Sequence, residues 1–228
     1  MSGADAAPLP FEAGRHPDSE AEIAVMRRRF ALLYIAGPVA ATAALLLGFY
    51  QEWPVVAAAG VIGFGALAIA LGALAIAERR LLFIVRNYQE ERRRYVLYEG
   101  IAAIPFGVSL IAGGAALIAL AALYLMGHSL GALRDQMLAR PGLALVPLGV
   151  ILTAKGLGFL IGFSRRAETL GGRAWVALLN LPGRLGGLIL FAWGAAALAI
   201  GAVEWARPEL FHHGFQSVFG VPWPFAGR

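Results

Sequence analysis

Residues 78–99 read ERRLLFIVRNYQEERRRYVLYE, and this stretch decides how the chain is threaded. It separates two long apolar runs, and its six arginines are Arg79, Arg80, Arg86, Arg92, Arg93 and Arg94. Loops on the cytoplasmic side of a membrane collect basic residues. We therefore expect a basic amphipathic connector, either a helical extension or a hairpin, with its arginines among lipid phosphates at the membrane surface. The alternative is a solvated connector supported by ion pairs within a helix.

The composition is that of a membrane protein. Hydrophobic residues make up 59% of the chain and charged residues 14%, whereas soluble domains carry about 25% charged residues. The absence of cysteine excludes disulfides, thiolate metal sites and a cysteine nucleophile. The net charge is +5, and the basic residues that give rise to it flank the apolar runs. The expected acidic partner is therefore anionic lipid and not nucleic acid.

Five apolar runs are long enough to span a bilayer, which takes about 20 helical residues. The runs cover residues 30–49, 55–77, 100–126, 142–163 and 185–203. The predicted fold class is all-α, an integral membrane bundle of five transmembrane helices. A cleaved signal peptide is the competing interpretation of the first run, but the run exceeds the h-region length of about 7–15 residues.

The chain divides into three predicted regions around these spans. Residues 1–25 are polar and rich in small residues, and we expect a flexible cytoplasmic tail. Residues 26–205 form the transmembrane domain, which contains the connector 78–99. Residues 206–228 form an aromatic tail on the outer face.

Two segments between the spans are less regular. Residues 127–140 are predicted to be a loop that ends at Arg140-Pro141. The apolar segment Trp175–Leu181 is followed by Pro182-Gly183, and we interpret it as a short interfacial helix before the fifth span. The alternative is one long broken helix that begins at Trp175.

The distribution of arginine predicts the orientation. With five spans, 14 arginines lie on the side that holds the connector and four on the opposite side. Among the 14, Arg165 and Arg166 follow the fourth span and join the connector arginines as expected contacts to lipid headgroups. The positive-inside rule then places the N-terminus inside and the C-terminus outside. Because 18 of the 19 basic residues are arginine, we expect the plasma (inner) membrane of a bacterium with a GC-rich genome.

Lys155 is the main polar candidate within a span, with Thr153 as a neighbouring partner. A lysine at the centre of a span costs about 2.5–3.5 kcal/mol on insertion scales. We therefore expect Lys155 to face other helices, water, a ligand or a partner chain. The structural alternative is that its side chain extends toward the cytoplasmic interface.

Small residues four positions apart are candidates for close helix packing. The pairs are Ala59 with Gly63, Ala68 with Gly72, and Gly158 with Gly162. Chance pairs in alanine-rich helices are the alternative interpretation.

The C-terminal tail alternates aromatic and polar residues. Phe211, Phe215 and Phe219 share one face of a helix, and Trp223 follows between two prolines. Such a tail is expected to lie on the outer membrane surface or on a partner chain.

No pattern in the sequence indicates catalysis. We found no nucleophile motif, no P-loop and no dinucleotide-binding motif, so no enzymatic activity and no cofactor are predicted. His128, His212, His213 and Glu209 would share the outer face, but adjacent histidines without helical spacing are a weak signal for a metal.

Three classes of function follow from these observations. The first is a non-catalytic membrane subunit or scaffold that packs against other membrane protein chains and anionic lipid. The second is a small-solute or ion transporter or channel that uses Lys155. The third is a lipid-active enzyme that uses the arginines around the fourth and fifth spans, namely Arg165, Arg166, Arg173 and Arg184.

Overall fold

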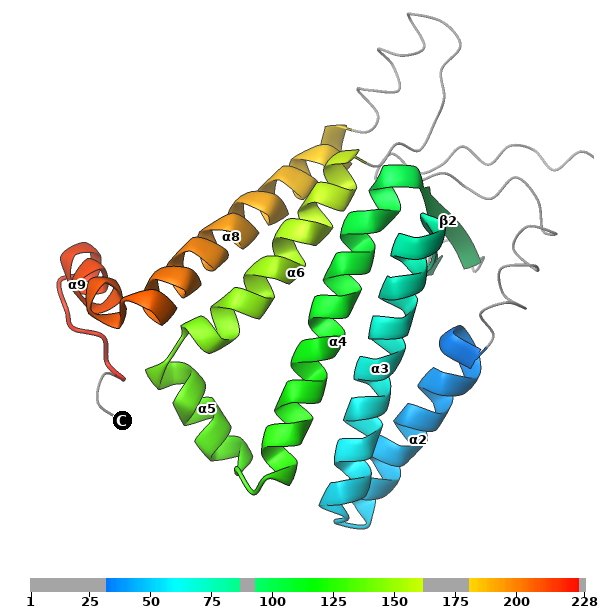
Figure 1. The fold of residues 1–228 in the computed structure, drawn as a ribbon, viewed down its shortest axis with the longest axis horizontal. Coiled ribbons are helices and arrows are strands. Elements are labelled where there is room, and N and C mark those ends of the chain that lie inside the picture. Colours follow the sequence, from blue (N-terminus) through cyan, green and yellow to red (C-terminus); the bar gives the residue numbers. More distant parts are fainter. Residues whose placement is uncertain (1–31, 87–92, 162–180, 226–228) are drawn as a thin grey trace, which may run out of the picture.

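The computed structural model describes residues 32–86, 93–161 and 181–225. Helices dominate these residues, and one pair of strands interrupts them (Figure 1). The elements in chain order are η1 (Leu32–Ala36), α2 (Gly37–Tyr50), α3 (Pro54–Glu78), β1 (Arg80–Arg86), β2 (Arg93–Glu99), η2 (Gly100–Ala102), α4 (Ala103–Leu125), α5 (Leu130–Ala139), α6 (Gly142–Ile161), α8 (Leu181–Ala206) and α9 (Pro208–Phe219).

Five helices of the described residues are long and apolar enough to cross a membrane. The ranges are Leu33–Tyr50, Pro54–Glu78, Gly100–Leu125, Gly142–Ile161 and Gly183–Ala206. They match the five predicted spans to within three residues at every end. The prediction of a helical membrane bundle is therefore confirmed at this level. The segment 175–180, whose interfacial placement was predicted, lies outside the described residues.

The five spanning helices form a single layer in the order α2, α3, α4, α6, α8 (Figure 1). The extensive helix contacts join helices that are consecutive in this order. The chain runs alternately up and down through the layer. The strands, the start of α2, the end of α6 and the start of α8 therefore lie at one end, which we call the hairpin end. The opposite end, which holds α5, is the α5 end.

Glycine creates three tight antiparallel helix pairs within this layer. In the α2–α3 pair, a Cβ atom on Gly60 would stand 2.6 Å from the backbone nitrogen of Leu45. In the α6–α8 pair, Gly149 of α6 lies so close to α8 that a Cβ atom there would stand 2.7 Å from the backbone nitrogen of Leu198. In the α3–α4 pair, a Cβ atom on Gly72 would stand 2.5 Å from the carbonyl oxygen of Gly107. Only a residue without a side chain permits such an approach of two backbones.

In the α6–α8 and α3–α4 pairs, the glycines of the close contact recur every seven residues. The α6–α8 contact uses Gly142, Gly149 and Gly156 on one helix and Gly187, Gly194 and Gly201 on the other. The α3–α4 contact uses Gly65 and Gly72 opposite Gly114 and Gly107. A seven-residue period keeps one side of a helix facing its partner along the whole contact. The predicted small-residue pairs have a spacing of four and do not include this period.

Of the two conformations predicted for the connector, the structure has the hairpin, because residues 80–86 and 93–99 are paired strands. The helical extension was wrong, while the other elements of the described chain are helices. β1 and β2 pair antiparallel from Arg80 opposite Glu99 to Arg86 opposite Arg93. The segments RLLFIVR and RRYVLYE are rich in the β-branched and aromatic residues that favour strands. At the base, the Gly100 N–H donates to the Arg79 carbonyl oxygen at 2.8 Å. The hairpin thereby connects the adjacent ends of α3 and α4.

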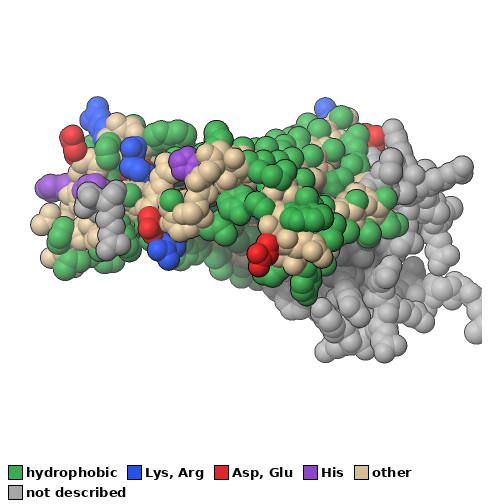
Figure 2. All heavy atoms as spheres, turned by 90° about the horizontal axis from the view of Figure 1, so that it is seen from below, with side chains coloured by type: hydrophobic (Ala, Val, Ile, Leu, Met, Phe, Trp, Pro, Cys, Tyr) green, Lys and Arg blue, Asp and Glu red, His purple; other side chains and the backbone are tan. Residues whose placement is uncertain are grey.

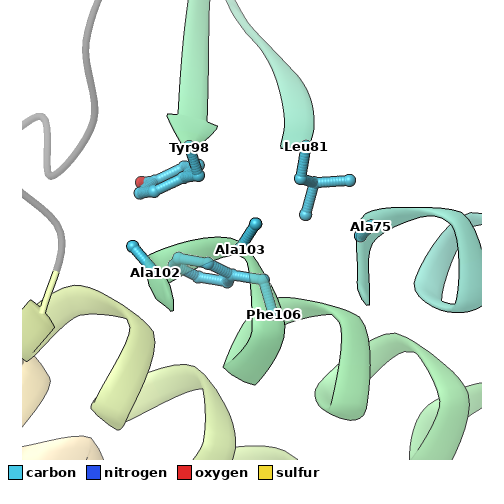
Figure 3. Packing of buried hydrophobic residues seen from close by; sticks show 6 residues of the cluster. All are labelled: Ala75, Leu81, Tyr98, Ala102, Ala103 and Phe106. Atoms are coloured by element: carbon cyan, nitrogen blue, oxygen red, sulfur yellow. The ribbon is translucent and has the colours of Figure 1, made fainter. Parts of the chain in front are cut away.

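A buried cluster anchors the hairpin on the helices (Figure 3). Leu81 and Tyr98 extend from the strands toward Ala103 and Phe106 at the start of α4, and all four are buried. The Tyr98 and Phe106 ring centroids lie 4.3 Å apart. Phe106 also stacks edge-on against Phe159 of α6, at 5.3 Å. This cluster therefore joins the hairpin, α4 and α6 at one end of the layer.

The segment predicted as a loop at 127–140 contains the helix α5, which is a second correction. Ser129 is its N-cap, and the Ser129 hydroxyl accepts a hydrogen bond from the Ala132 N–H at 3.1 Å. A serine before a helix is a common start signal, and the sequence analysis did not use it. α5 spans the space between α4 and α6, which diverge toward this end (Figure 1).

Candidate functional site: an apolar cavity at the α5 end

An apolar cavity of about 870 Å³ lies at the α5 end, where α4 and α6 diverge. Side chains from α2, α3, α4, α5, α6, α8, α9 and the C-terminal tail line it. The lining residues are Leu45, Phe49, Ala57, Ala58, Val61, Leu120, Ala121, Tyr124, Leu130, Leu133, Arg134, Met137, Leu138, Pro141, Ala144, Leu145, Ile200, Phe211, Phe215 and Trp223. Its volume falls within the range of about 300–1,000 Å³ that is usual for ligand pockets.

Arg134 is the one charged residue among those that line the cavity. Its side chain is 72% exposed, and its Nη2 atom lies 2.8 Å from Oδ1 of Asp135, which is also exposed. Exposed ion pairs of this kind contribute at most about 1 kcal/mol. The guanidinium can therefore exchange Asp135 for another anion at little cost.

The aromatic tail forms one wall of this cavity. Phe211 and Phe215 lie on α9, with ring centroids 6.4 Å apart, and Trp223 packs edge-on against both, at 5.4 Å and 4.8 Å. The Trp223 indole N–H donates to the carbonyl oxygen of Leu138 at 3.0 Å. Phe219 continues the row, 4.5 Å from Phe215. The tail thus packs on α5 of its own chain, a contact that the sequence analysis did not anticipate.

A buried carboxylate joins α6 and α8 at the same end. Glu204 is 1% exposed, and its Oε1 accepts a hydrogen bond from Arg140 Nε at 2.7 Å. Its Oε2 accepts from the Gly142 N–H at 3.0 Å, in the first turn of α6. A carboxylate at this position also interacts favourably with the positive end of the helix dipole. Glu204 follows directly after the predicted fifth span, which ends at residue 203, and this contact was not predicted.

Lys155 and Thr153 lie on different sides of α6. Lys155 is exposed and makes no hydrogen bond or ion pair with any residue that the structure describes. Thr153 faces α8, where Gly194 approaches it, and its hydroxyl oxygen is buried without a hydrogen-bond partner in the described part of the chain. The two side chains are therefore not brought together, and neither lines the cavity.

The predicted small-residue positions divide among several contacts. Gly63 faces Ala41 of α2, Gly72 faces α4, and Gly158 lies against the Phe106 ring. Ala59 is exposed and Ala68 is half-buried. Gly162 lies outside the described residues.

Those predicted lipid-binding arginines that lie within the described residues are all located at the hairpin end. Arg79 and Arg80 stand exposed where α3 meets β1, and Arg86, Arg93 and Arg94 belong to the strands. Arg92, Arg165 and Arg166 fall outside the described ranges. At the α5 end, charged side chains occupy scattered points on a mainly hydrophobic surface (Figure 2).

The histidines and acids of the α5 end do not form a metal-binding group within the described ranges. Nε2 of His212 is buried on α9 and lacks a hydrogen-bond partner among the residues that the structure describes. Comparison of the chain with protein-family models, with curated proteins and with solved structures gives no match. The function must therefore be inferred from the architecture and the sites of this chain.

Proposed function

We propose that this chain is a non-catalytic integral membrane subunit or scaffold, which packs against other membrane protein chains and against anionic lipid. The observation that carries this proposal is the single layer of spanning helices. In each spanning segment, only 11–22% of the residues are buried inside the chain. Both broad faces of the layer are thus available to lipid and to partner chains.

The edges and faces of the layer carry large exposed apolar side chains. On the edge helix α8, Trp193 is 69% and Ile189 57% exposed. On α6, Leu148 and Leu157 are 47% and 38% exposed. Helix association in membranes depends on close packing and interhelical polar contacts. The exposed faces of this single layer are available for such close packing and polar contacts with helices of a partner chain.

Lys155 supports a partner contact on one broad face. Its ammonium is exposed within a spanning helix, where an unpaired charge is unfavourable. A carboxylate of a partner chain or a lipid phosphate would compensate that charge. Leu148 lies seven residues before Lys155, about two helical turns, and therefore on the same side of α6.

Photo-crosslinking from the two faces of α6 tests the scaffold proposal. Leu148 and Leu157 are nine residues apart, about two and a half turns, so they point to opposite faces of the layer. A photo-crosslinking residue is placed at either position in the full chain, in its native membrane. We expect a stoichiometric protein adduct from the Leu148 position, reduced by Lys155→Met and retained in Lys155→Arg. Lipid adducts alone from both positions, with a monodisperse monomer after mild extraction, would contradict the proposal.

The proposed orientation places the hairpin end in the cytoplasm of a bacterial cell, against anionic headgroups of the inner membrane. Support comes from the clustering of arginines at that end. Because the chain has no cysteine, single cysteines report accessibility directly. Gln51→Cys and His128→Cys should react with a membrane-impermeant maleimide on intact cells, whereas Arg80→Cys should react only after permeabilisation. The reverse pattern would invert the orientation.

A small-solute or ion transporter that uses Lys155 is the second proposal. In its favour, Ala144 of the cavity wall lies 11 residues before Lys155, about three turns, on the same side of α6. Transport predicts that Lys155→Met abolishes flux in liposomes while the folded chain is retained. Unchanged flux would remove Lys155 from that mechanism.

A further inference from the structure

The cavity at the α5 end reaches into the depth of the membrane. Val61 is seven residues from the start of α3, which corresponds to about 10 Å along the helix axis. Leu120 lies five residues before the end of α4 and Leu145 three residues after the start of α6, or about 8 Å and 5 Å along the helix axes. Arg134 and Trp223 lie outside the spanning segments. The cavity therefore extends from the membrane surface into the hydrocarbon of one leaflet.

Its chemistry is that of an acyl-chain site with a charged rim. The lining is apolar apart from the Arg134 guanidinium and the Tyr124 hydroxyl. Apolar cavities do not retain water, and the apolar medium around a spanning helix is the lipid acyl chain. Arginine is well suited to phosphate, because its planar guanidinium donates two parallel hydrogen bonds.

We propose that this cavity binds one acyl chain of an anionic phospholipid, with the lipid phosphate held by Arg134. Phe211, Phe215 and Trp223 form one wall for the acyl chain, and residues of α5 form another. Asp135 releases Arg134 to the phosphate, because their exposed ion pair is weak. The site is built from this chain alone, so it is independent of the proposed role as a scaffold.

Trp223 supplies the measurement, because its indole lines the cavity. In a variant that keeps Trp223, the other tryptophans are replaced by phenylalanine, namely Trp53, Trp175, Trp193 and Trp205. The full chain is placed in phosphatidylcholine nanodiscs that contain a small fraction of phosphatidylglycerol with brominated acyl chains. We expect saturable quenching of Trp223 fluorescence. Half-maximal quenching should occur at a bromolipid fraction at least tenfold below the fraction needed for random contact.

Filling the cavity provides the specific variant. Ala144 lines it, whereas Ala195 is an exposed alanine on the uncovered side of α8. Ala144→Phe should shift half-maximal quenching at least tenfold, with a smaller shift for Ala144→Leu, while Ala195→Phe should leave it unchanged. Gel filtration of each variant shows whether it is folded. If Ala144→Phe does not fold, the smaller shift expected for Ala144→Leu still tests the proposal.

Two further comparisons, one of lipid headgroups and one of unbrominated competitors, show which lipid supplies the bound acyl chain. Arg134→Gln should weaken quenching by brominated phosphatidylglycerol about tenfold and leave brominated phosphatidylcholine unaffected. Excess unbrominated phosphatidylglycerol should reverse the quenching. The proposed acyl-chain site would be contradicted if quenching were proportional to the bulk bromolipid fraction and were unchanged in Ala144→Phe. Displacement by oleate but not by phosphatidylglycerol, or identical quenching by both headgroups, would overturn the assignment to an anionic phospholipid.

Discussion

The α6–α8 pair and the α4–α6 contact show two ways in which neighbouring helices pack in one layer. Three glycines on each helix bring the backbones of α6 and α8 together along their whole length, and Glu204 joins their ends. α4 and α6 meet closely only near the hairpin end, where Phe106 lies against Gly158. Further along, a Cβ atom on Gly113 would stand 3.8 Å from Ile151, an ordinary contact.

This difference divides the layer into two closely packed parts, which meet at a looser seam between α4 and α6. α2, α3 and α4 form one part, and α6 and α8 form the other. The seam is closed at the hairpin end by the buried cluster and opens at the α5 end into the cavity. Tight glycine contacts leave no room for a ligand between the two helices that they join, whereas α4 and α6 diverge and leave space for the cavity.

Phe106→Ala should break the closed end of the seam and have the largest effect. The ring is 2% exposed and contacts Tyr98, Gly158 and Phe159. Removing a buried phenylalanine costs about 3–5 kcal/mol. Thermal unfolding in detergent should show a large loss of stability, whereas Phe49→Ala, at a ring that is 75% exposed, should change little. Equal effects of the two variants would mean that the cluster does not hold the seam.

A matched pair of glycine variants contrasts the tight contact with the seam. Gly149→Ala forces a methyl group toward the α8 backbone, and we expect a loss of about 1–3 kcal/mol in the free energy of unfolding. Gly113→Ala has room for the methyl group and should be neutral or stabilising by up to about 1 kcal/mol, because alanine favours helix. If both variants unfold at the same temperature, the two contacts do not differ in tightness.

Glu204→Gln sharpens the comparison at the α5 end. The carboxylate is buried between Arg140 and the Gly142 N–H, and replacing its charge should cost about 1–2 kcal/mol. Asp135→Asn removes the exposed partner of Arg134 and should cost under about 0.5 kcal/mol. Both unfolding temperatures are measured in the same detergent. A loss for Asp135→Asn as large as that for Glu204→Gln would argue against burial as the cause.

Trp223→Phe tests the attachment of the aromatic wall and should have a smaller effect than Phe106→Ala, Gly149→Ala or Glu204→Gln. It keeps an aromatic ring but removes the hydrogen bond to the Leu138 carbonyl, so we expect a loss of about 1 kcal/mol at most. A limited-proteolysis assay should show faster cleavage after residue 206, while Trp205→Phe, at a side chain that is 60% exposed, should behave as the parent chain. Unchanged cleavage in Trp223→Phe would show that this bond does not attach the tail.

Some interactions were recoverable from the sequence in principle but were not found. The glycines of α6 and α8 repeat every seven residues, a pattern that is plain once a period of seven is tested. Ser129 before α5 was a readable start signal. The hairpin was harder, because arginine-rich runs with aliphatic residues every three or four positions also suit a helix. Pairing with a second strand decided between the two conformations.

The sequence by itself determined the five spans and the clustering of arginines in the segments at one end of them. Both depend on runs of about 20 residues and on local charge, which need no knowledge of distant contacts. Only the tertiary structure decided that the helices form one layer, that Glu204 reaches Gly142 across 62 residues, and that the tail lines a cavity with α5. These features depend on how closely backbones approach, and that distance is set by pairs of residues far apart in the chain.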